Sequence, residues 1–458
     1  MNAPTRNARA ASPGPTRHVP GAALVATLAL TALLYSAAGA ADGVLSVYRE
    51  ALRSDSTYLA VAAATRATRE ARPQARAALL PLIGASASTS GTDLDLRRSN
   101  VGFTTRRNNF HSTQIQLTLT QPLYRRDLWI ALSQATDQIK QAEAQFAFAG
   151  QELIVRVAVR YFAVLQAIDD LRFARSVLKA FGEQLKQSRQ RFDVGLIAVT
   201  DVEESQAGFD LANSQVISAQ NQIDNAREAL REVTGTYHSS LAPLRAKMTL
   251  TTPDPDSIDS WAKRALENNF SVRAARYAAA IAKKEISRIE SGHLPTLDLV
   301  GSHARDSSNG LSGSHTWTTT LGLQLNVPIF QGGLVLSRTR QSRHLYQQAV
   351  EELERARRNV ERQTRDDFLN IKSAIAQIKA LRQAVRSNES ATRAVKAGFE
   401  VGTRTSVDVL DAQRDLFKAR SDLSAARYQY ILDVLRLKQA AGTLAEEDIQ
   451  KVDALLKP

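Results

Sequence analysis

The chain has 458 residues, no cysteine and a formal net charge of +13. The lack of cysteine excludes disulfide bonds and thiolate-bound metal sites, and the seven histidines are scattered without the spacing of metal ligands. A strongly basic chain raises nucleic acid as a partner. The basic residues form no compact module, however, so we expect anionic lipid or an acidic cargo as partners and no nucleic acid.

The first 40 residues have the pattern of an export signal. This leader has no acidic residue and contains three arginines, Arg6, Arg9 and Arg17. An apolar stretch follows over residues 21–34, which is short for a transmembrane helix. Ala38-Gly39-Ala40 then forms an A-x-A site, so we expect a signal peptide over residues 1–40 that is cleaved between Ala40 and Ala41. A short membrane anchor is the alternative.

Beyond the leader, the sequence contains one unit twice. Residues 191–236 align with residues 398–443 without a gap, which superposes Gly195 on Gly402 and Asp201 on Asp408. A duplication of this length predicts two copies of one architectural unit. We therefore expect five parts: a signal peptide (1–40), a first repeat (41–236), a connector (237–257), a second repeat (258–443) and a C-terminal tail (444–458).

Each repeat is expected to begin with a helix, over about residues 44–77 and 258–291, that stops before a Leu-Pro pair. Two strands follow in each repeat. They are predicted near residues 82–92 and 114–120 in the first copy, and near 296–305 and 321–327 in the second. Polar loops are expected between them, over about residues 93–109 and 306–315.

These strands alternate apolar and polar residues, which places the two kinds of side chain on opposite faces. Strands of roughly 9–11 residues can cross a bilayer when tilted, and polar-inward alternation suits a water-filled barrel. Beyond residue 40 no apolar run is long enough for a spanning helix, so a bilayer destination requires strands. Four strands cannot close a barrel, so several chains would have to share one. A soluble hairpin is the alternative.

Two long stretches, residues 125–194 and 333–401, contain no proline. Each would extend for about 100 Å as a helix. Apolar residues recur every seven positions in both, as in the series Val157, Val164, Leu171, Leu178 and Leu185. This coiled-coil pattern predicts long helices that pack side by side. Between the repeats, Pro243, Pro253 and Pro255 favour a non-helical connector.

The sequence contains none of the common motifs for hydrolysis, phosphate binding, dinucleotide binding or zinc catalysis. We therefore predict no enzymatic activity, no cofactor and no metal. Asp408 and Asp411 stand three residues apart just after a turn, as a metal-binding or acid–base pair would. Asp415 and Asp422 continue the series, which favours the alternative of a solvated helix face.

Two segments of the chain resemble the helix-turn-helix tips of TolC-type outer-membrane channel proteins. They are residues 191–202 (RFDVGLIAVTDV) and 401–412 (VGTRTSVDVLDA), with supporting matches at residues 161–169 and 77–81. The resemblance implies a fold that is dominated by α-helix and includes β-structure. In a homotrimer, four strands from each protomer would form a twelve-stranded outer-membrane β-barrel, and long coiled-coil helices would continue it as a barrel into the periplasm.

The resemblance also implies a function and partners. The trimer would be the exit duct of a tripartite export system for type I protein secretion, multidrug efflux or both. Its partners would be a periplasmic adaptor, an inner-membrane transporter (ABC or proton-driven) and outer-membrane lipid. A periplasmic coiled-coil adaptor without a pore is the alternative, and the alternating strands are evidence against it.

The family resemblance assigns roles at the tips. Gly195 and Gly402 would form the two tip turns. Asp408 and Asp411 would ring the pore constriction. Six carboxylates around one narrow entrance would favour cations and raise one another's pKa.

The same resemblance implies a latch that holds the tips closed. Thr200 and Asp201 of the first turn would pair with Arg404 of the second turn. Phe399 stands where the compared family member has tyrosine, so one closing hydrogen bond, worth about 0.5–1.5 kcal/mol, would be missing. We therefore expect the latch to depend mainly on Arg404.

Overall fold

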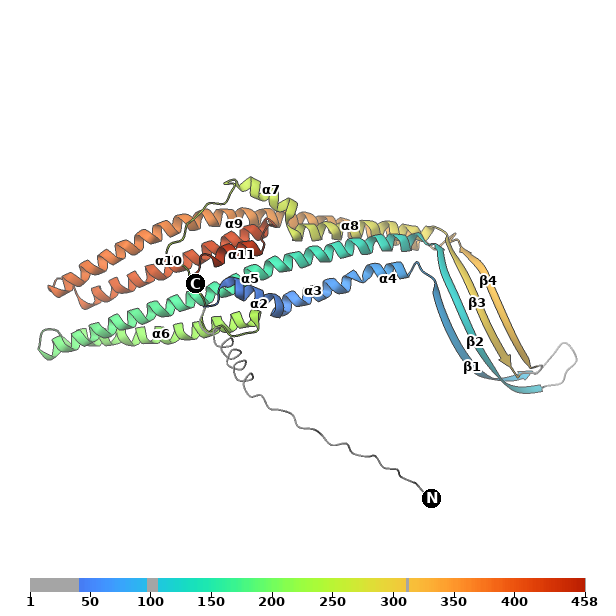
Figure 1. Ribbon diagram of the computed structural model, residues 1–458, viewed down its shortest axis with the longest axis horizontal. Coiled ribbons are helices and arrows are strands. Elements are labelled where there is room, and N and C mark those ends of the chain that lie inside the picture. The colour runs from blue at the N-terminus through green and yellow to red at the C-terminus, as the bar shows by residue number, and fades with distance from the viewer. Residues whose placement is uncertain (1–40, 97–105, 310–312, 458) are drawn as a thin grey trace, which may run out of the picture.

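The structure is a computed structural model that describes residues 41–96, 106–309 and 313–457. The expected signal peptide, with its cleavage site after Ala40, lies outside the described residues. The described chain forms a long rod of helices with a single β-sheet at one end (Figure 1).

Two helices run along the rod from the sheet to the opposite tip (Figure 1). They are α5 (Arg126–Asp193, 68 residues) and α9 (Leu334–Glu400, 67 residues), and each length corresponds to about 100 Å. After each tip turn the chain returns as α6 (Val199–Thr234) and α10 (Ser406–Ala440). The predictions of long helices from residues 125–194 and 333–401 are confirmed.

The half of the rod nearer the sheet is completed by shorter helices. They are α2 (Val44–Ser54), α3 (Ser56–Arg69), α4 (Ala71–Ala77), α7 (Ile258–Asn268), α8 (Phe270–Glu290) and the 3-10 turn η1 (Ser291–His293). The expected single helices over residues 44–77 and 258–291 are therefore wrong. Asp55 and Asn269 are the reason: each has extended backbone, and its side chain accepts hydrogen bonds from the first turn of a new helix.

The sheet contains four antiparallel strands in sequence order: β1 (Leu82–Leu96), β2 (Arg106–Tyr124), β3 (Thr296–Ser308) and β4 (Ser314–Asn326). The strands are longer than expected, and much of the polar segments 93–109 and 306–315 is strand rather than loop. The backbone ladder continues through them, for example where Asp93 pairs with Asn109. Strands β1 and β4 are the two edges of the sheet.

The strand register gathers leucines on one face of the sheet. Leu299 pairs with Leu323, and Leu297 pairs with Leu325. Paired residues of antiparallel strands share a face, and Leu323 and Leu325 are 66% and 63% exposed. The opposite face carries polar residues such as Gln116 and Thr118. A contiguous exposed apolar face of this kind marks a surface that meets lipid or another protein.

None of the helices in the described ranges combines the length and the hydropathy that crossing a bilayer requires.

The main hydrophobic core lies midway along the rod, where α2, α5, α9 and α10 meet the connector. Its fully buried side chains include Leu153, Tyr161, Phe162, Ile371 and Leu435. Within residues 444–458 the chain folds into α11 (Glu446–Asp453), which packs near α2. The connector is non-helical, as expected, and it pairs with both ends of the described chain through the bridges Asp42–Leu241 and Leu244–Leu456.

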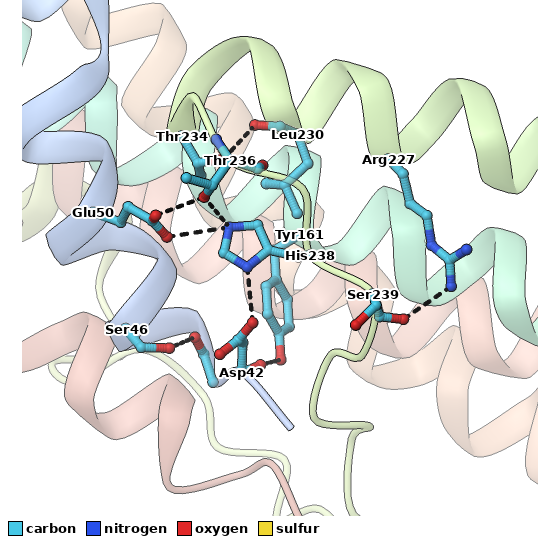
Figure 2. A network of polar contacts seen from close by, with 11 residues as sticks. Asp42, Ser46, Glu50, Tyr161, Arg227, Leu230, Thr234, Thr236, His238 and Ser239 are labelled. Carbon is cyan, nitrogen blue, oxygen red and sulfur yellow. Dashed lines mark hydrogen bonds and ion pairs between the residues drawn. The ribbon is translucent and has the colours of Figure 1, made fainter. Parts of the chain in front are cut away.

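A polar network fastens the first described residues to this core (Figure 2). Buried His238 places Nδ1 2.8 Å from Asp42 Oδ2, and its Nε2 lies 3.3 Å from Glu50 Oε2. The hydroxyl of Tyr161 donates to the carbonyl oxygens of Asp42 and Ala242, at 3.0 and 2.9 Å. These contacts hold together the first described residues, α2, α5 and the connector.

Candidate functional site

The first tip turn joins α5 to α6 through a glycine that the geometry requires. Gly195 has φ +75°, in the left-handed region, which residues with a Cβ rarely adopt. Helix α6 then begins after Ala198, whose N–H donates to Asp201 Oδ2 at 3.2 Å. Asp201 therefore caps the start of α6, and Thr200 beside it is exposed.

The second turn repeats this construction between α9 and α10. Gly402 has φ +81°. Thr405 and Asp408 form a capping box: Asp408 N–H donates to Thr405 Oγ1 at 3.2 Å, and Thr405 N–H donates to Asp408 Oδ2 at 2.9 Å. Hydrogen bonding of the Asp408 carboxylate by the backbone N–H and the side chain of Thr405, together with the nearby charge of Arg404, lowers the pKa of Asp408. Its carboxylate is therefore ionised at neutral pH.

Asp411 lies one helical turn after Asp408, so the two carboxylates share a face of α10. Its Oδ1 is 2.9 Å from Nη2 of Arg414, and both side chains are more than half exposed. An exposed pair of this kind contributes little to stability. Sequence reasoning missed Arg414, although its spacing of three residues from Asp411 was visible.

The two hairpins contact each other near the tips through an aromatic ring. The guanidinium carbon of Arg191, in α5, lies 4.5 Å from the ring centroid of Phe399, in α9. This is the geometry of a cation–π interaction. From the sequence, Phe399 was noted only because it replaces a tyrosine of the compared family member. The contact between its ring and Arg191 was not predicted.

A layer of buried hydroxyl groups also joins the hairpins. Ser188 and Ser205 are 2% and 1% exposed, and their hydroxyl oxygens lie 2.9 Å apart. Gln184 Nε2 donates to Ser406 Oγ at 2.7 Å, and Ser406 Oγ lies 3.5 Å from that of Ser205. The layer connects α5, α6 and α10, and the sequence analysis did not predict it.

The expected latch residues do not meet within one chain. Thr200 and Asp201 lie at the start of α6, while Arg404 is exposed in the second turn. Among the described residues, no hydrogen bond or ion pair joins Arg404 to Thr200 or Asp201. The backbone N–H of Arg404 instead donates to the carbonyl oxygen of Gly398 at 3.2 Å.

Between the two hairpins lies a polar cleft of about 370 Å³, lined by Gln184, Gln187, Arg191, Lys396 and Phe399 among others. Across the described ranges, histidine and acidic side chains form no group of three that could hold a metal ion.

Comparison with known proteins places these features in a family. The model of the family described as outer membrane efflux protein matches residues 47–236 and 261–443. Outer membrane protein TolC of Vibrio cholerae serotype O1 is 40% identical over 422 residues, which cover 91% of this chain and 94% of that protein. Alkaline protease secretion protein AprF of Pseudomonas aeruginosa is 30% identical over 417 residues, covering 90% of this chain and 87% of that protein.

The fold agrees with these matches. The solved structure of the Campylobacter jejuni CmeC outer membrane channel has a TM-score of 0.78 and 15% sequence identity, and the match covers 90% of each chain. The resemblance to TolC-type channels is thus confirmed, and the alternative of a pore-free adaptor is not supported. The two matched segments contain both tip turns and all the candidate site residues, and the chain belongs to the outer membrane efflux protein family.

Proposed function

We propose that three copies of the chain form an exit duct in the outer membrane that continues into the periplasm. The observation that carries this proposal is the sheet, which has two open edges and an exposed apolar face. Open edges expose unpaired backbone groups, which a bilayer does not tolerate. Pairing β4 of one copy with β1 of the next would close a twelve-stranded barrel with its polar face lining the channel.

The duct serves an export system with an inner-membrane transporter, either ABC or proton-driven, and a periplasmic adaptor. Two similarities support this assignment: AprF is named for protease secretion, and the matched family is described by efflux. Type I protein secretion and multidrug efflux are therefore the two export functions we assign. The family is one of transport channels, and we assign the chain no enzymatic activity.

The tips form the gate of this duct. In a trimer, Asp408 and Asp411 contribute six carboxylates around the constriction, which favours passage of cations. Arg404 meets Thr200 and Asp201 of a neighbouring hairpin. Arg404 and Thr200 are exposed in a single chain and Asp201 is half-buried, which leaves these groups available to an adjacent copy. Gly195 and Gly402 allow the tight turns that bring these groups together.

Three measurements on the native system test this function. The purified mature protein is expected to be a trimer that conducts ions across a planar lipid bilayer. Deletion of the gene is expected to increase drug sensitivity, remove a protein from the medium, or both. A monomeric, water-soluble product that gives no current would overturn the proposal.

A further inference from the structure

The apolar face of the sheet changes character at its far end from the helices. Successive β3–β4 pairs on this face begin with leucines (Leu297–Leu325, Leu299–Leu323, Gly301–Leu321) and continue with His303–Thr319, Arg305–Trp317 and Ser307–His315. The same face therefore carries leucines near the helices and basic side chains beyond them. We call His303, Arg305, His315 and Trp317 the rim cluster.

The rim cluster is organised around the indole ring of Trp317. The guanidinium carbon of Arg305 lies 5.2 Å from the indole centroid, and the ring of His303 lies 5.4 Å from it on the neighbouring strand. His303 Nδ1 is 2.8 Å from Thr319 Oγ1, and His315 Nδ1 is 2.8 Å from Ser307 Oγ. Side-chain contacts thus hold both imidazole rings and the guanidinium in place at the surface.

The N–H groups of Arg305 have no acidic partner among the described residues, which indicates a ligand outside the chain. Arg305 and Trp317 are exposed, the latter by 65%. In the part of the chain that the structure describes, Arg305 forms no ion pair. The nearest acid in its own strand, Asp306, projects from the opposite face, because neighbours in a strand alternate. A guanidinium at the edge of an apolar face that meets lipid is expected to have an anionic partner.

The height of the cluster identifies the environment it meets. From Leu325 to Trp317 the strand rises by about 27 Å at roughly 3.4 Å per residue, or about 20 Å across the membrane when tilted by about 40°. The apolar band of outer-membrane barrels is about 25 Å tall and ends in aromatic girdles. Trp317 therefore lies at the edge of the apolar band, on the side away from the periplasmic helices, where outer-leaflet headgroups begin.

We propose that the rim cluster binds the phosphate of a phosphorylated glycolipid in the outer leaflet. Arg305 supplies the planar pair of N–H donors that binds phosphate in a bidentate manner. His303 and His315 supply further ring nitrogens, and Trp317 holds the guanidinium at headgroup level. The inference rests on the proposed barrel, because that assembly turns this face toward lipid.

Lipid binding by the full-length trimer in uncharged detergent tests the proposal. The probes are diphosphoryl lipid A, its dephosphorylated form and inorganic phosphate, and bound lipid is counted by native mass spectrometry. The wild-type trimer is expected to retain diphosphoryl lipid A and to lose the dephosphorylated form. Arg305→Gln should weaken retention by about tenfold, while Arg305→Lys should keep part of it, because lysine retains the charge without the bidentate fork.

The control variant, Arg340→Gln, also removes one positive charge. Arg340→Gln removes one exposed charge from α9, away from the rim cluster, and is expected to retain lipid as the wild type does. Equal retention by Arg305→Gln overturns the proposal, and so does displacement of the lipid by millimolar inorganic phosphate. The current carried by wild-type trimers separates the two claims: a normal current with no retention of diphosphoryl lipid A by the wild type leaves the duct intact and refutes only the lipid site.

Discussion

The guanidinium of Arg191 covers the ring of Phe399 at 4.5 Å and so links the end of α5 to the end of α9. The two residues are more than 200 positions apart in the sequence. Phe399 lacks the hydroxyl that a tyrosine would provide at this position. Its ring face instead contacts the guanidinium of Arg191, so the position still joins the two helices.

Replacing Arg191 by glutamine is expected to loosen the closed tip. A cation–π contact of this kind is worth about 0.5–2 kcal/mol, so the ratio of open to closed channels should rise by about 2- to 30-fold. Phe399→Leu should have the same effect, whereas Phe399→Tyr, which keeps the ring, should not. The measurement is the open fraction of single trimers in planar bilayers.

The control for this experiment is Phe192→Leu. Phe192 is the counterpart of Phe399 in the first repeat, and its side chain is exposed. If Arg191→Gln trimers open no more often than wild-type trimers, the contact plays no part in closure. The same recordings made with Arg404→Ser test the proposed latch of Arg404, Thr200 and Asp201, for which an unchanged closed-state conductance would be a negative result.

Neutralising Asp408 or Asp411 is expected to reduce the preference of the channel for cations. Asparagine retains an acceptor oxygen, so Asp408→Asn keeps the cap of α10 while it removes the charge. Hydrogen bonds from Thr405 lower the pKa of Asp408 within one chain and so oppose the rise that clustered carboxylates cause in one another. The wild-type preference should therefore persist in mildly acidic solution. Reversal potentials in a KCl gradient measure this property.

Asp415→Asn provides the comparison, since Asp415 is an exposed carboxylate on the same helix. The reversal potential of Asp415→Asn should equal that of the wild type. A reversal potential that moves equally in all three variants would indicate a general charge effect and not a ring at the constriction.

Asp367 is expected to make the stability of the helical rod depend on pH. Burial raises its pKa from 3.8 to about 6, and nearby Asp433 adds to the rise. The folded state thus takes up a proton at higher pH than the unfolded state does. The free energy of unfolding should fall as pH rises from about 4 through about 6, by at most about 3 kcal/mol for this group.

Asp367→Asn should therefore raise the unfolding temperature at pH 7.5 and change it little at pH 4. Circular dichroism melts at the two pH values measure this difference. Asp366→Asn is the matched control, because Asp366 is half exposed and pairs with Arg362 at 2.8 Å. A melting temperature for Asp367→Asn that varies with pH as steeply as that of the wild type would contradict the assignment.

An ion pair crosses the junction between strand β3 and the start of α5. Arg125 binds Asp298 through two contacts, Nη2–Oδ2 at 2.7 Å and Nε–Oδ1 at 3.1 Å. Asp298 is 8% exposed, so Arg125→Gln would leave a buried carboxylate without its cation. We expect a loss of about 1–3 kcal/mol in the free energy of unfolding, seen as a lower unfolding temperature.

Arg126→Gln removes the neighbouring exposed arginine and should leave that temperature unchanged. The double variant Arg125→Gln, Asp298→Asn should recover part of the loss, because it removes the buried charge as well. If it is no more stable than Arg125→Gln alone, the ion pair is not what stabilises the junction.

Much of the fold could be predicted from the sequence, because it depends on periodic patterns. The heptads of the long helices and the alternation of the strands are local signals, and both were identified correctly. The breaks at Asp55 and Asn269 were not identified. Each breaks a continuous helical pattern with a single capping side chain, and propensity summed over a window does not detect such a residue.

The candidate site was predictable only in part, for a similar reason. Gly195 and Gly402 were identified from the internal repeat and the family resemblance, and both have the positive φ that a tight turn requires. Arg191 and the buried layer of Ser188 and Ser205 were missed. Their contacts join separate helices, and nothing in the local sequence specifies which partner such a side chain meets.

The pairings of Asp42 with Leu241 and of Leu244 with Leu456 bring two segments more than 400 positions apart to one place, halfway along the rod. The middle of the rod therefore cannot finish folding until the chain has been exported as far as Leu456. A reporter inserted directly after Leu456 would emerge from the flank of the rod, rather than at the sheet or at the tip turns.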